Sequence, residues 1–376
     1  MIKFWNYIRE YKKFRKEILN KLDKTILKGN IFFGVELDNF EKKFIKKYKS
    51  RFGVAVGSGT DALLISLKAI DIRNGDEIIT AANTAIPTIS AIVNSGAKPK
   101  LVDVGEDYLI DTSKIERHIT KKTKAIIPVH LYGQACDMSK IRLIAKKYKL
   151  KVIEDCAQAQ GAKYQDKFVG TLGNFGCFSF YPTKILGAYG DGGFITTNNY
   201  KDYLKIRRLR FYGIETINKK NLFYNKYYAN ENGLNSRLDE IQSSILNIKL
   251  KYVDKFINKR IRLANLYLKH LKNTSIKLPK TNKLKKHVFH LFTVSHPKKK
   301  KIVKMLEKKR IGTRVIYPYP INIMKGYKNY NFDNHDLKYS KKLSKEIFSL
   351  PLYPELKDYE VKKICEALIK ILKKIN

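Results

Sequence analysis

Short apolar runs alternate with longer amphipathic runs between residues 54 and 155 of this chain. The apolar runs have the length of strands, and the amphipathic runs have the apolar spacing of helices. The expected strands are Val54–Val56, Glu77–Thr80, Lys100–Val104, Ala125–Val129 and Lys151–Asp155, and the expected helices are Thr60–Ile70, Ile86–Asn94, Ser113–His118 and Met138–Tyr148. Strands and helices that alternate in this way form right-handed βαβ units, so the sequence predicts an α/β fold with a largely parallel sheet.

The alternation changes after Asp155. Gly176–Phe180 and Gly193–Thr197 both have the character of strands, and too few residues separate them for a helix. Strands joined by so short a connection pair antiparallel. We therefore expect a mixed, mostly parallel sheet with at least one antiparallel member.

The chain has 376 residues, which is long enough for two domains. A long helical pattern over Ile241–Leu271 is expected to link a large domain to a smaller C-terminal one. The expected division is an N-terminal helix and arm in residues 1–30, a large domain in residues 31–245 and a small α+β domain in residues 246–376. In the small domain we expect strands near Val288–Val294 and Gly312–Ile316 and helices at Ile302–Lys308 and Val361–Leu372.

The net charge of +42 raises the question of nucleic-acid binding. The basic excess is mainly lysine and is spread along the whole chain, whereas phosphate and base recognition favours arginine. The one dense run, Lys298–Lys301, is typical of a solvated face. We therefore expect no nucleic-acid partner, although part of the charge can attract a small anionic substrate.

The four cysteines, Cys136, Cys156, Cys177 and Cys365, show no CxxC spacing, so neither a metal site nor a disulfide framework is predicted. Reduced thiols are typical of the cytoplasm. The N-terminal residues lack the apolar stretch of a signal peptide, and no window approaches the length of a membrane span. The expected location is cytoplasmic, without a membrane partner.

Asp155 ends an expected strand, which is where ligands gather in open α/β sheets. A carboxylate at this place can keep the pyridine nitrogen of pyridoxal 5'-phosphate protonated, and the cofactor then works best as an electron sink. The alternative is an aspartate that caps the next helix.

Gly59 and Thr60 follow an expected strand and open an expected helix. The glycine lets backbone N–H groups approach an anion, and the helix N-terminus and the threonine hydroxyl add to the attraction. The pair fits the cofactor phosphate; the alternative is a glycine turn with a threonine N-cap. Neither a Walker loop nor a GxGxxG fingerprint is present.

Lys184 stands between Phe178–Thr183 and a glycine-rich turn, Gly187–Gly193. Ser179 offers a further hydroxyl for the phosphate, and the turn can deliver the lysine to the ring. Such a lysine can act as a nucleophile and later as a general base. The alternative is a solvated surface lysine. A lysine that forms an imine, an aspartate and a phosphate loop are together the parts of a pyridoxal phosphate site.

Several segments, in the same order along the chain, resemble the DegT/DnrJ/StrS family of sugar-nucleotide aminotransferases. They are Gly57–Leu63, Gly96–Pro99, Pro128–Gln134, Glu154–Ala159, the Lys184 segment, Gly233–Gln242 and Ser349–Leu352. The resemblance implies a pyridoxal phosphate-dependent transferase of fold type I, a homodimer with its active sites at the subunit interface.

The resemblance also implies a role for each matching residue. Lys184 corresponds to the imine lysine, Asp155 to the partner of the ring nitrogen and Gln158 to the contact of the ring hydroxyl. The expected phosphate ligands are Gly59, Thr60, Ser179 and, from the neighbouring subunit, Asn235. The implied reaction is a ping-pong transfer from glutamate to a nucleotide-linked keto sugar.

Further segments resemble the subgroup that acts at C3 of dTDP-3-keto-6-deoxyhexoses, namely Arg210–Glu215, Tyr227–Ala229 and Arg314–Pro320. Tyr181, Tyr317 and Phe33 are the expected sugar contacts, with simple packing as their alternative. Ala85 replaces an aromatic residue common among relatives, so no ring is expected to stack on the cofactor from there. Three alternatives stay open: a C4 aminotransferase on a 4-keto sugar, a NAD-linked sugar enzyme and a charge-driven nucleic-acid binder.

Overall fold

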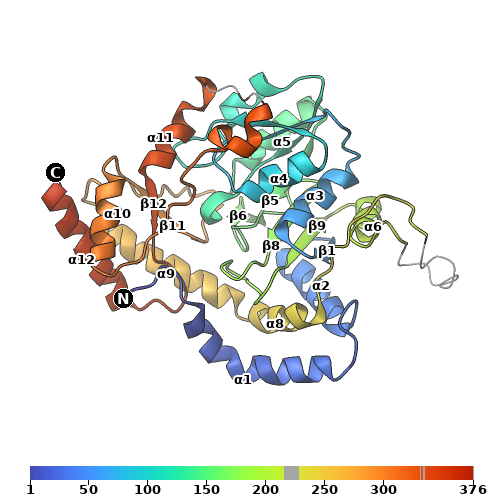
Figure 1. Ribbon diagram of the computed structural model, residues 1–376, viewed down its shortest axis with the longest axis horizontal. Helices are drawn as coiled ribbons and strands as arrows, with labels where there is room; N and C mark the ends of the chain where they lie inside the picture. Colours follow the sequence, from blue (N-terminus) through green and yellow to red (C-terminus); the bar gives the residue numbers. More distant parts are fainter. Residues whose placement is uncertain (216–227, 331, 333–334, 376) are drawn as a thin grey trace.

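The computed structural model describes residues 1–215, 228–330, 332 and 335–375, and Figure 1 shows its arrangement. A seven-stranded sheet has the order β1-β9-β8-β5-β4-β2-β3. Its strands are β1 Phe52–Val56, β2 Glu77–Ala81, β3 Lys98–Val102, β4 Thr123–Ile127, β5 Lys151–Asp155, β8 Phe175–Ser179 and β9 Gly193–Thr197. β9 is antiparallel to both β1 and β8, and all other neighbours are parallel. The expected mixed, mostly parallel sheet is confirmed.

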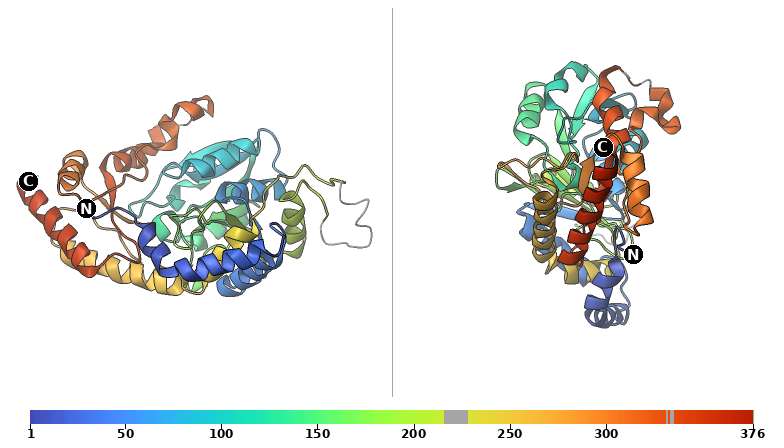
Figure 2. Two further views of the ribbon diagram at one scale, coloured as in Figure 1. Left: turned by 60° about the horizontal axis from the view of Figure 1, so that its bottom comes forward. Right: turned by 90° about the vertical axis from the view of Figure 1, so that its left-hand side faces the viewer.

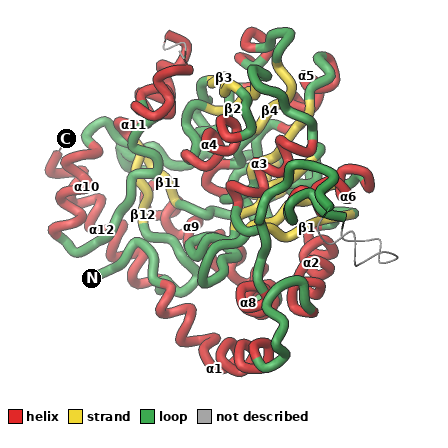
Figure 3. Tube along the Cα trace, turned by 45° about the vertical axis from the view of Figure 1, so that its right-hand side comes forward, coloured by secondary structure: helices red, strands yellow, loops and turns green. Residues whose placement is uncertain are grey.

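Helices cover both faces of this sheet (Figure 3). One face carries α3 Gly59–Ala69, α4 Ile86–Asn94 and α6 Tyr200–Leu209, and the other carries α2 Val35–Tyr48, α5 Met138–Lys147 and α8 Glu240–Leu250. Successive strand residues serve opposite faces: Val54 and Val56 pack in the first layer, whereas Ala55 packs in the second. This two-residue period explains why the strands are apolar throughout, since both faces are buried.

Two expected helices differ in the structure. Ser113–His118 is not an α-helix but a pair of 3-10 turns, η1 Thr112–Lys114 and η2 Glu116–His118. The long pattern Ile241–Leu271 is two helices, α8 and α9 Val253–Leu271, because the chain turns at Lys251 and Tyr252. The apolar spacing persists across the turn, since both helices pack against the same core.

The N-terminal residues form a helix and an arm. α1, Tyr7–Ile26, packs against α8 through Phe14, Ile18 and Ile245, and the two helices lie side by side in Figures 1 and 2. The preceding arm pairs elsewhere: the Ile2 N–H donates to the Arg310 carbonyl oxygen (2.8 Å) and the Gly312 N–H donates to the Ile2 carbonyl oxygen (2.9 Å).

The C-terminal part has its own apolar core. It contains the antiparallel pair β11 Phe292–Ser295 and β12 Ile347–Leu350, with α9, α10 Lys299–Lys308 and α12 Asp358–Ile375 around it. The expected strand Gly312–Ile316 is wrong, because that segment makes only one bridge, between Arg314 and Ser349. The partner of β11 is β12, a strand that the sequence reasoning missed. The division into domains at residue 245 stays a prediction.

The remaining elements are short. They are the small sheet of β6 Lys163–Tyr164, β7 Lys167–Phe168 and β10 Lys285–Lys286, the helix α11 Lys338–Glu346, and the 3-10 turns η3 Leu131–Gly133, η5 Ile321–Ile323, η6 Lys325–Tyr330 and η7 His335–Leu337. Within the described residues, every helix is too short or too polar to span a bilayer.

Candidate active site

A cavity of about 430 Å³ opens where strands of the central sheet end and where α3 and α4 begin. Eight of the residues singled out in the sequence line it: Gly59, Thr60, Asp155, Gln158, Ser179, Tyr181, Lys184 and Tyr317. They come from positions more than 250 residues apart along the chain. Most of them follow β1, β5 and β8, whose carboxyl ends share one edge of the sheet, whereas Tyr317 comes from the C-terminal part.

Asp155 is the last residue of β5 and is buried, with 4% of its surface exposed. Its Oδ2 accepts a hydrogen bond from the Thr88 hydroxyl (2.8 Å), and its Oδ1 accepts one from the Ala157 N–H (3.1 Å). Burial raises the pKa of Asp155, while these two hydrogen bonds and the charge of Lys184 act to lower it. A protonated ring nitrogen would give this buried carboxylate the cationic partner that burial demands.

Lys184 lies in the turn that follows β8. Its N–H donates to the Tyr181 carbonyl oxygen (2.9 Å), and the turn closes where the Ala188 N–H donates to the Phe180 carbonyl oxygen (2.7 Å). Burial lowers the pKa of Lys184 to about 8, although the charge of Asp155 opposes this shift. A neutral amine is thus accessible close to physiological pH, as a nucleophilic lysine requires.

The start of α3 forms an anion cradle. Ser58 is the N-cap residue, and its Oγ accepts a hydrogen bond from the Asp61 N–H (3.1 Å). Gly59 lies so close to Ser179 that a Cβ atom built on it would stand 2.7 Å from the Ser179 Cβ. The backbone at Gly59 and Thr60, the helix N-terminus and the Ser179 hydroxyl therefore face one small space, which suits a phosphate group.

Gln158 has a defined orientation. Its Oε1 accepts from the Tyr132 N–H (2.9 Å), so its Nε2 is the group that donates to the Tyr317 hydroxyl (2.9 Å). Burial, together with the charge of Asp155, raises the pKa of Tyr317, which keeps this hydroxyl protonated. The Gln158 amide and the Tyr317 hydroxyl therefore lie side by side, and both groups can form hydrogen bonds with the hydroxyl group of a bound ring.

Two expected site residues lie outside this cavity. Asn235 is exposed and forms a bridge with Phe211. Phe33 packs edge to face against Phe211, with ring centroids 5.3 Å apart, and Arg210 lies 5.1 Å from the centre of its ring. Both residues therefore contact Phe211, and neither lines the cavity of their own chain that contains Lys184.

Sequence reasoning missed Thr88 and Tyr132, which hold Asp155 and Gln158 in place. Thr88 stands in the first turn of α4 after Pro87, a position that marks a helix start, but nothing local indicates that it meets β5. Ala85 and Pro87 form part of the cavity wall.

One buried trio has the composition of a metal site: His130, Glu154 and Cys156. The Glu154 carboxylate already accepts hydrogen bonds from His130 Nε2 and from the N–H groups of Gly170, Leu172 and Gly173. His130 Nδ1 accepts from the Cys136 N–H (3.0 Å). His130 and Glu154 are therefore already engaged in hydrogen bonds, and Glu154 precedes Asp155 in the same strand.

Comparison with known proteins agrees with this geometry. Residues 12–369 match the DegT/DnrJ/EryC1/StrS aminotransferase family. The chain belongs to this family. It is a pyridoxal phosphate-dependent aminotransferase of the fold that its sheet and cavity display.

Individual relatives are similar over nearly their whole length. The dTDP-3-amino-3,6-dideoxy-alpha-D-galactopyranose transaminase of Aneurinibacillus thermoaerophilus is 42% identical, over 98% of this chain and 99% of that protein. The dTDP-3-amino-3,4,6-trideoxy-alpha-D-glucose transaminase of Micromonospora megalomicea subsp. nigra is 38% identical, over 98% of both chains. The crystal structure of S. venezuelae DesV in complex with a ketimine intermediate superposes with a TM-score of 0.94 at 32% identity, over 100% of this chain and 99% of that one.

Proposed function

We propose that this aminotransferase moves an amino group from glutamate to C3 of a dTDP-linked 3-keto-6-deoxyhexose, in the cytoplasm. The observation that supports amino transfer is the meeting of Lys184, Asp155 and the anion cradle in one cavity. The sugar and the carbon atom rest on the two relatives at 38% and 42% identity, whose names specify dTDP-3-amino sugars.

The residues of the cavity fit the cofactor. Asp155 would hold the ring nitrogen, Gln158 the ring hydroxyl, and Gly59, Thr60 and Ser179 the phosphate. Two features of the chain support this assignment. Asp155 is buried and makes no ion pair within 4 Å among the described residues, and Gly59 approaches Ser179 closely. When bound, pyridoxal phosphate supplies the electron sink that makes the donor Cα acidic.

Lys184 is the proposed acid–base group. Its amine would take the proton from the Cα of glutamate in the first half of the reaction. In the second half it would act at the sugar carbon that receives the amino group. A pKa of about 8 suits both directions, because the amine can hold or release a proton near neutral pH.

The sugar would enter past Tyr181, which is 52% exposed at the cavity wall, and past Tyr317. Asn235 and Phe33 would serve the cavity of a second copy, which makes a homodimer part of the proposal. Their exposure, and their absence from the lining of the cavity of the same chain, support this arrangement.

Product analysis tests the proposal. Enzyme, pyridoxal phosphate and glutamate are incubated with dTDP-4-keto-6-deoxyglucose, with and without a 3,4-ketoisomerase, and NMR locates the new amine. We expect an amine at C3 that forms only with the isomerase. An amine at C4 without the isomerase would replace the proposal with C4 transfer, and glutamate consumption without either product would contradict the proposed acceptor.

A further inference from the structure

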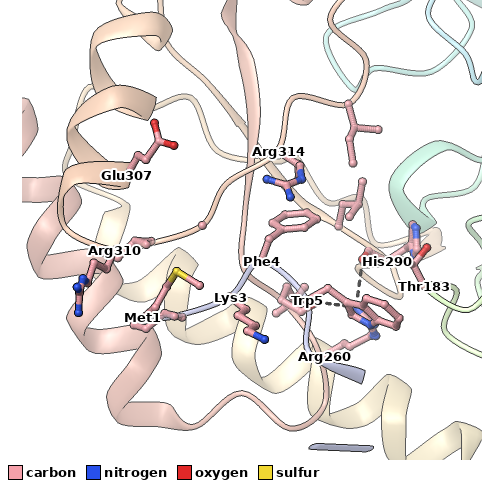
Figure 4. A pocket seen from close by; sticks show the side chains of 16 residues that line it. Met1, Lys3, Phe4, Trp5, Thr183, Arg260, His290, Glu307, Arg310 and Arg314 are labelled. Atoms are coloured by element: carbon pink, nitrogen blue, oxygen red, sulfur yellow. Dashed lines mark hydrogen bonds between the residues drawn. The ribbon is translucent and has the colours of Figure 1, made fainter. Parts of the chain in front are cut away.

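A second cavity, of about 620 Å³, lies between the N-terminal arm and the C-terminal part of the molecule (Figure 4). Residues 1–5 form one wall, and the segment around Ile311 that pairs with Ile2 forms another. The two cavities share no lining residue, although Thr183 and Ile316 in this one precede Lys184 and Tyr317 in the other. The volume is within the range of small-molecule sites.

The inner end of this cavity holds two buried polar side chains with unused atoms. Arg260, 3% exposed, donates through Nη1 to the carbonyl oxygens of Phe289, His290 and Leu352 at 3.4, 3.1 and 2.8 Å. Its Nε has no hydrogen-bond partner within the described residues, and neither has Nδ1 of His290, which is 6% exposed. Buried polar atoms without a partner destabilise a fold unless a ligand or water satisfies them.

The charge around the cavity is also unbalanced. Lys3, Arg310 and Arg314 are exposed residues of its wall, and Glu307 is the acidic residue of the wall. None of these four side chains, nor Arg260, makes an ion pair within 4 Å in the described part of the chain. Burial lowers the pKa of Arg260 to about 10, and Glu355 and Glu10 counter this only from beyond ion-pair distance. An anion would compensate the charge more effectively than these distant carboxylates do.

Apolar groups line the space between these cations. Phe4, Trp5, Ile311 and Leu352 contribute to the wall, and Arg314 lies 6.0 Å from the centre of the Phe4 ring. Figure 4 shows Arg260, Trp5 and His290 together at one end, with Met1 and Arg310 at the other. A ligand that fits has a charged head and an apolar body.

We propose that this cavity binds a small organic anion, with its carboxylate or phosphate group at Arg260 and His290 and its apolar body against Phe4 and Trp5. The site shares no lining residue with the amino-transfer cavity, so the proposal does not depend on which sugar the enzyme uses.

The chain contains one tryptophan, and this residue lies in the cavity. Its fluorescence therefore reports occupancy directly. The full-length holoenzyme, in which the cofactor fills the other anion cradle, is titrated with phenyl phosphate, with benzoate and with benzyl alcohol as an uncharged probe of similar shape. We expect a saturable change with at least one of the two anions, and the tighter of them identifies the head group. Benzyl alcohol should give no saturation over the same range.

Variants locate the binding. Arg260→Gln should weaken the anion by about tenfold or more, because it removes a buried charge-assisted contact. Arg260 also donates to three backbone carbonyl oxygens, so its replacement could disturb the interior. A double variant of exposed residues, Lys3→Gln with Arg314→Gln, is therefore a second test. We expect it to weaken anion binding by about fivefold. Lys304→Gln, on the exposed side of α10 and outside the cavity, is the matched control and should not change the affinity.

Three results would overturn the proposal: no saturable response to either anion, an equal response to benzyl alcohol, or unchanged anion affinity in both the Arg260 variant and the double variant. Loss of amino transfer in any variant has no bearing on these readouts, so failure of the proposed function remains distinguishable from failure of this site.

Discussion

At Lys184 and Asp155, burial shifts the pKa of each side chain toward its neutral form, while the charge of each favours the ionised form of the other. Because of these opposing effects, Lys184 can lose its proton near pH 8, and the buried carboxylate of Asp155 can pair with a cation. Neither property belongs to the residue type alone, because an exposed lysine has a pKa of about 10.4.

Replacing Lys184 by alanine tests its role as the acid–base group. We expect turnover to fall by about 10⁴-fold, the upper range for removal of a general base, and covalent trapping of the cofactor by borohydride to disappear. Lys167→Ala, at an exposed position on β7, is the control and should behave like the wild type. A Lys184→Ala enzyme that keeps full activity would remove the proposed mechanism.

Asp155→Ala separates tuning of the cofactor ring from simple anchoring. If the carboxylate sets the charge of the ring nitrogen, kcat should fall by about 10²-fold or more while cofactor affinity changes far less. Steady-state kinetics at saturating cofactor, together with a cofactor titration of the apoenzyme, measure both quantities. Equal losses in the two would show that Asp155 is only an anchor.

The pKa of Lys184 predicts a pH dependence in the apoenzyme. Only the neutral amine attacks the cofactor aldehyde, so the rate of cofactor capture should rise with pH, be half-maximal near pH 8 and level off only at higher pH. The charge of Asp155 favours the protonated amine, so Asp155→Asn should move the midpoint to lower pH. Stopped-flow absorbance over the pH range gives the midpoint for both proteins, and a midpoint above pH 10 in the wild type would contradict the shift.

Among the helices and strands, the junction between β1 and α3 requires one particular residue type, a glycine at position 59. α3 must begin against β8, because Gly59 stands beside Ser179. A side chain at this position would push the two elements apart and close the anion cradle between them. The glycine is therefore required by the close approach of two elements, not by an unusual backbone angle.

Gly59→Ala is expected to weaken cofactor affinity by about 10- to 100-fold, since overpacking of this size costs about 1–3 kcal/mol. The fold should persist, as judged by circular dichroism. Gly326→Ala is the matched control, because an added Cβ there has no heavy atom within 4 Å. An unchanged affinity of the Gly59 variant would show that the phosphate binds elsewhere.

For the whole molecule, Asn235 and Phe33 are exposed beside Phe211, and neither lines the Lys184 cavity of their own chain. If they complete the cavity of a partner subunit, two inactive variants should complement each other. A heterodimer of Lys184→Ala and Asn235→Ala chains would contain one intact site. Mixing and refolding equal amounts should restore about a quarter of wild-type activity, because half of the dimers are mixed and each has one working site. No recovery would contradict the shared site.

The sequence by itself determined the alternation of strands and helices, the antiparallel β9, and Lys184, Asp155 and Gly59 as candidates. These features are local: an apolar run, a strand end and a glycine before a helix are visible within a few residues. β5, β9 and α4 begin and end at the residues expected from the sequence. The expected strand Gly312–Ile316 is wrong because a strand needs a partner along its length, and this segment makes only one bridge, from Arg314 to Ser349 of β12.

Only the tertiary structure decided which residues meet. Thr88 reaches Asp155 and Tyr132 orients Gln158 because parallel strands end at a common edge, and no local pattern encodes those contacts. The same holds for the cavity around Trp5 and Arg260, whose walls come from both ends of the chain. Burial follows from these long-range contacts, and burial lowers the pKa of Lys184. The type of residue at each position can be read from the sequence, whereas the surroundings of its side chain depend on the fold.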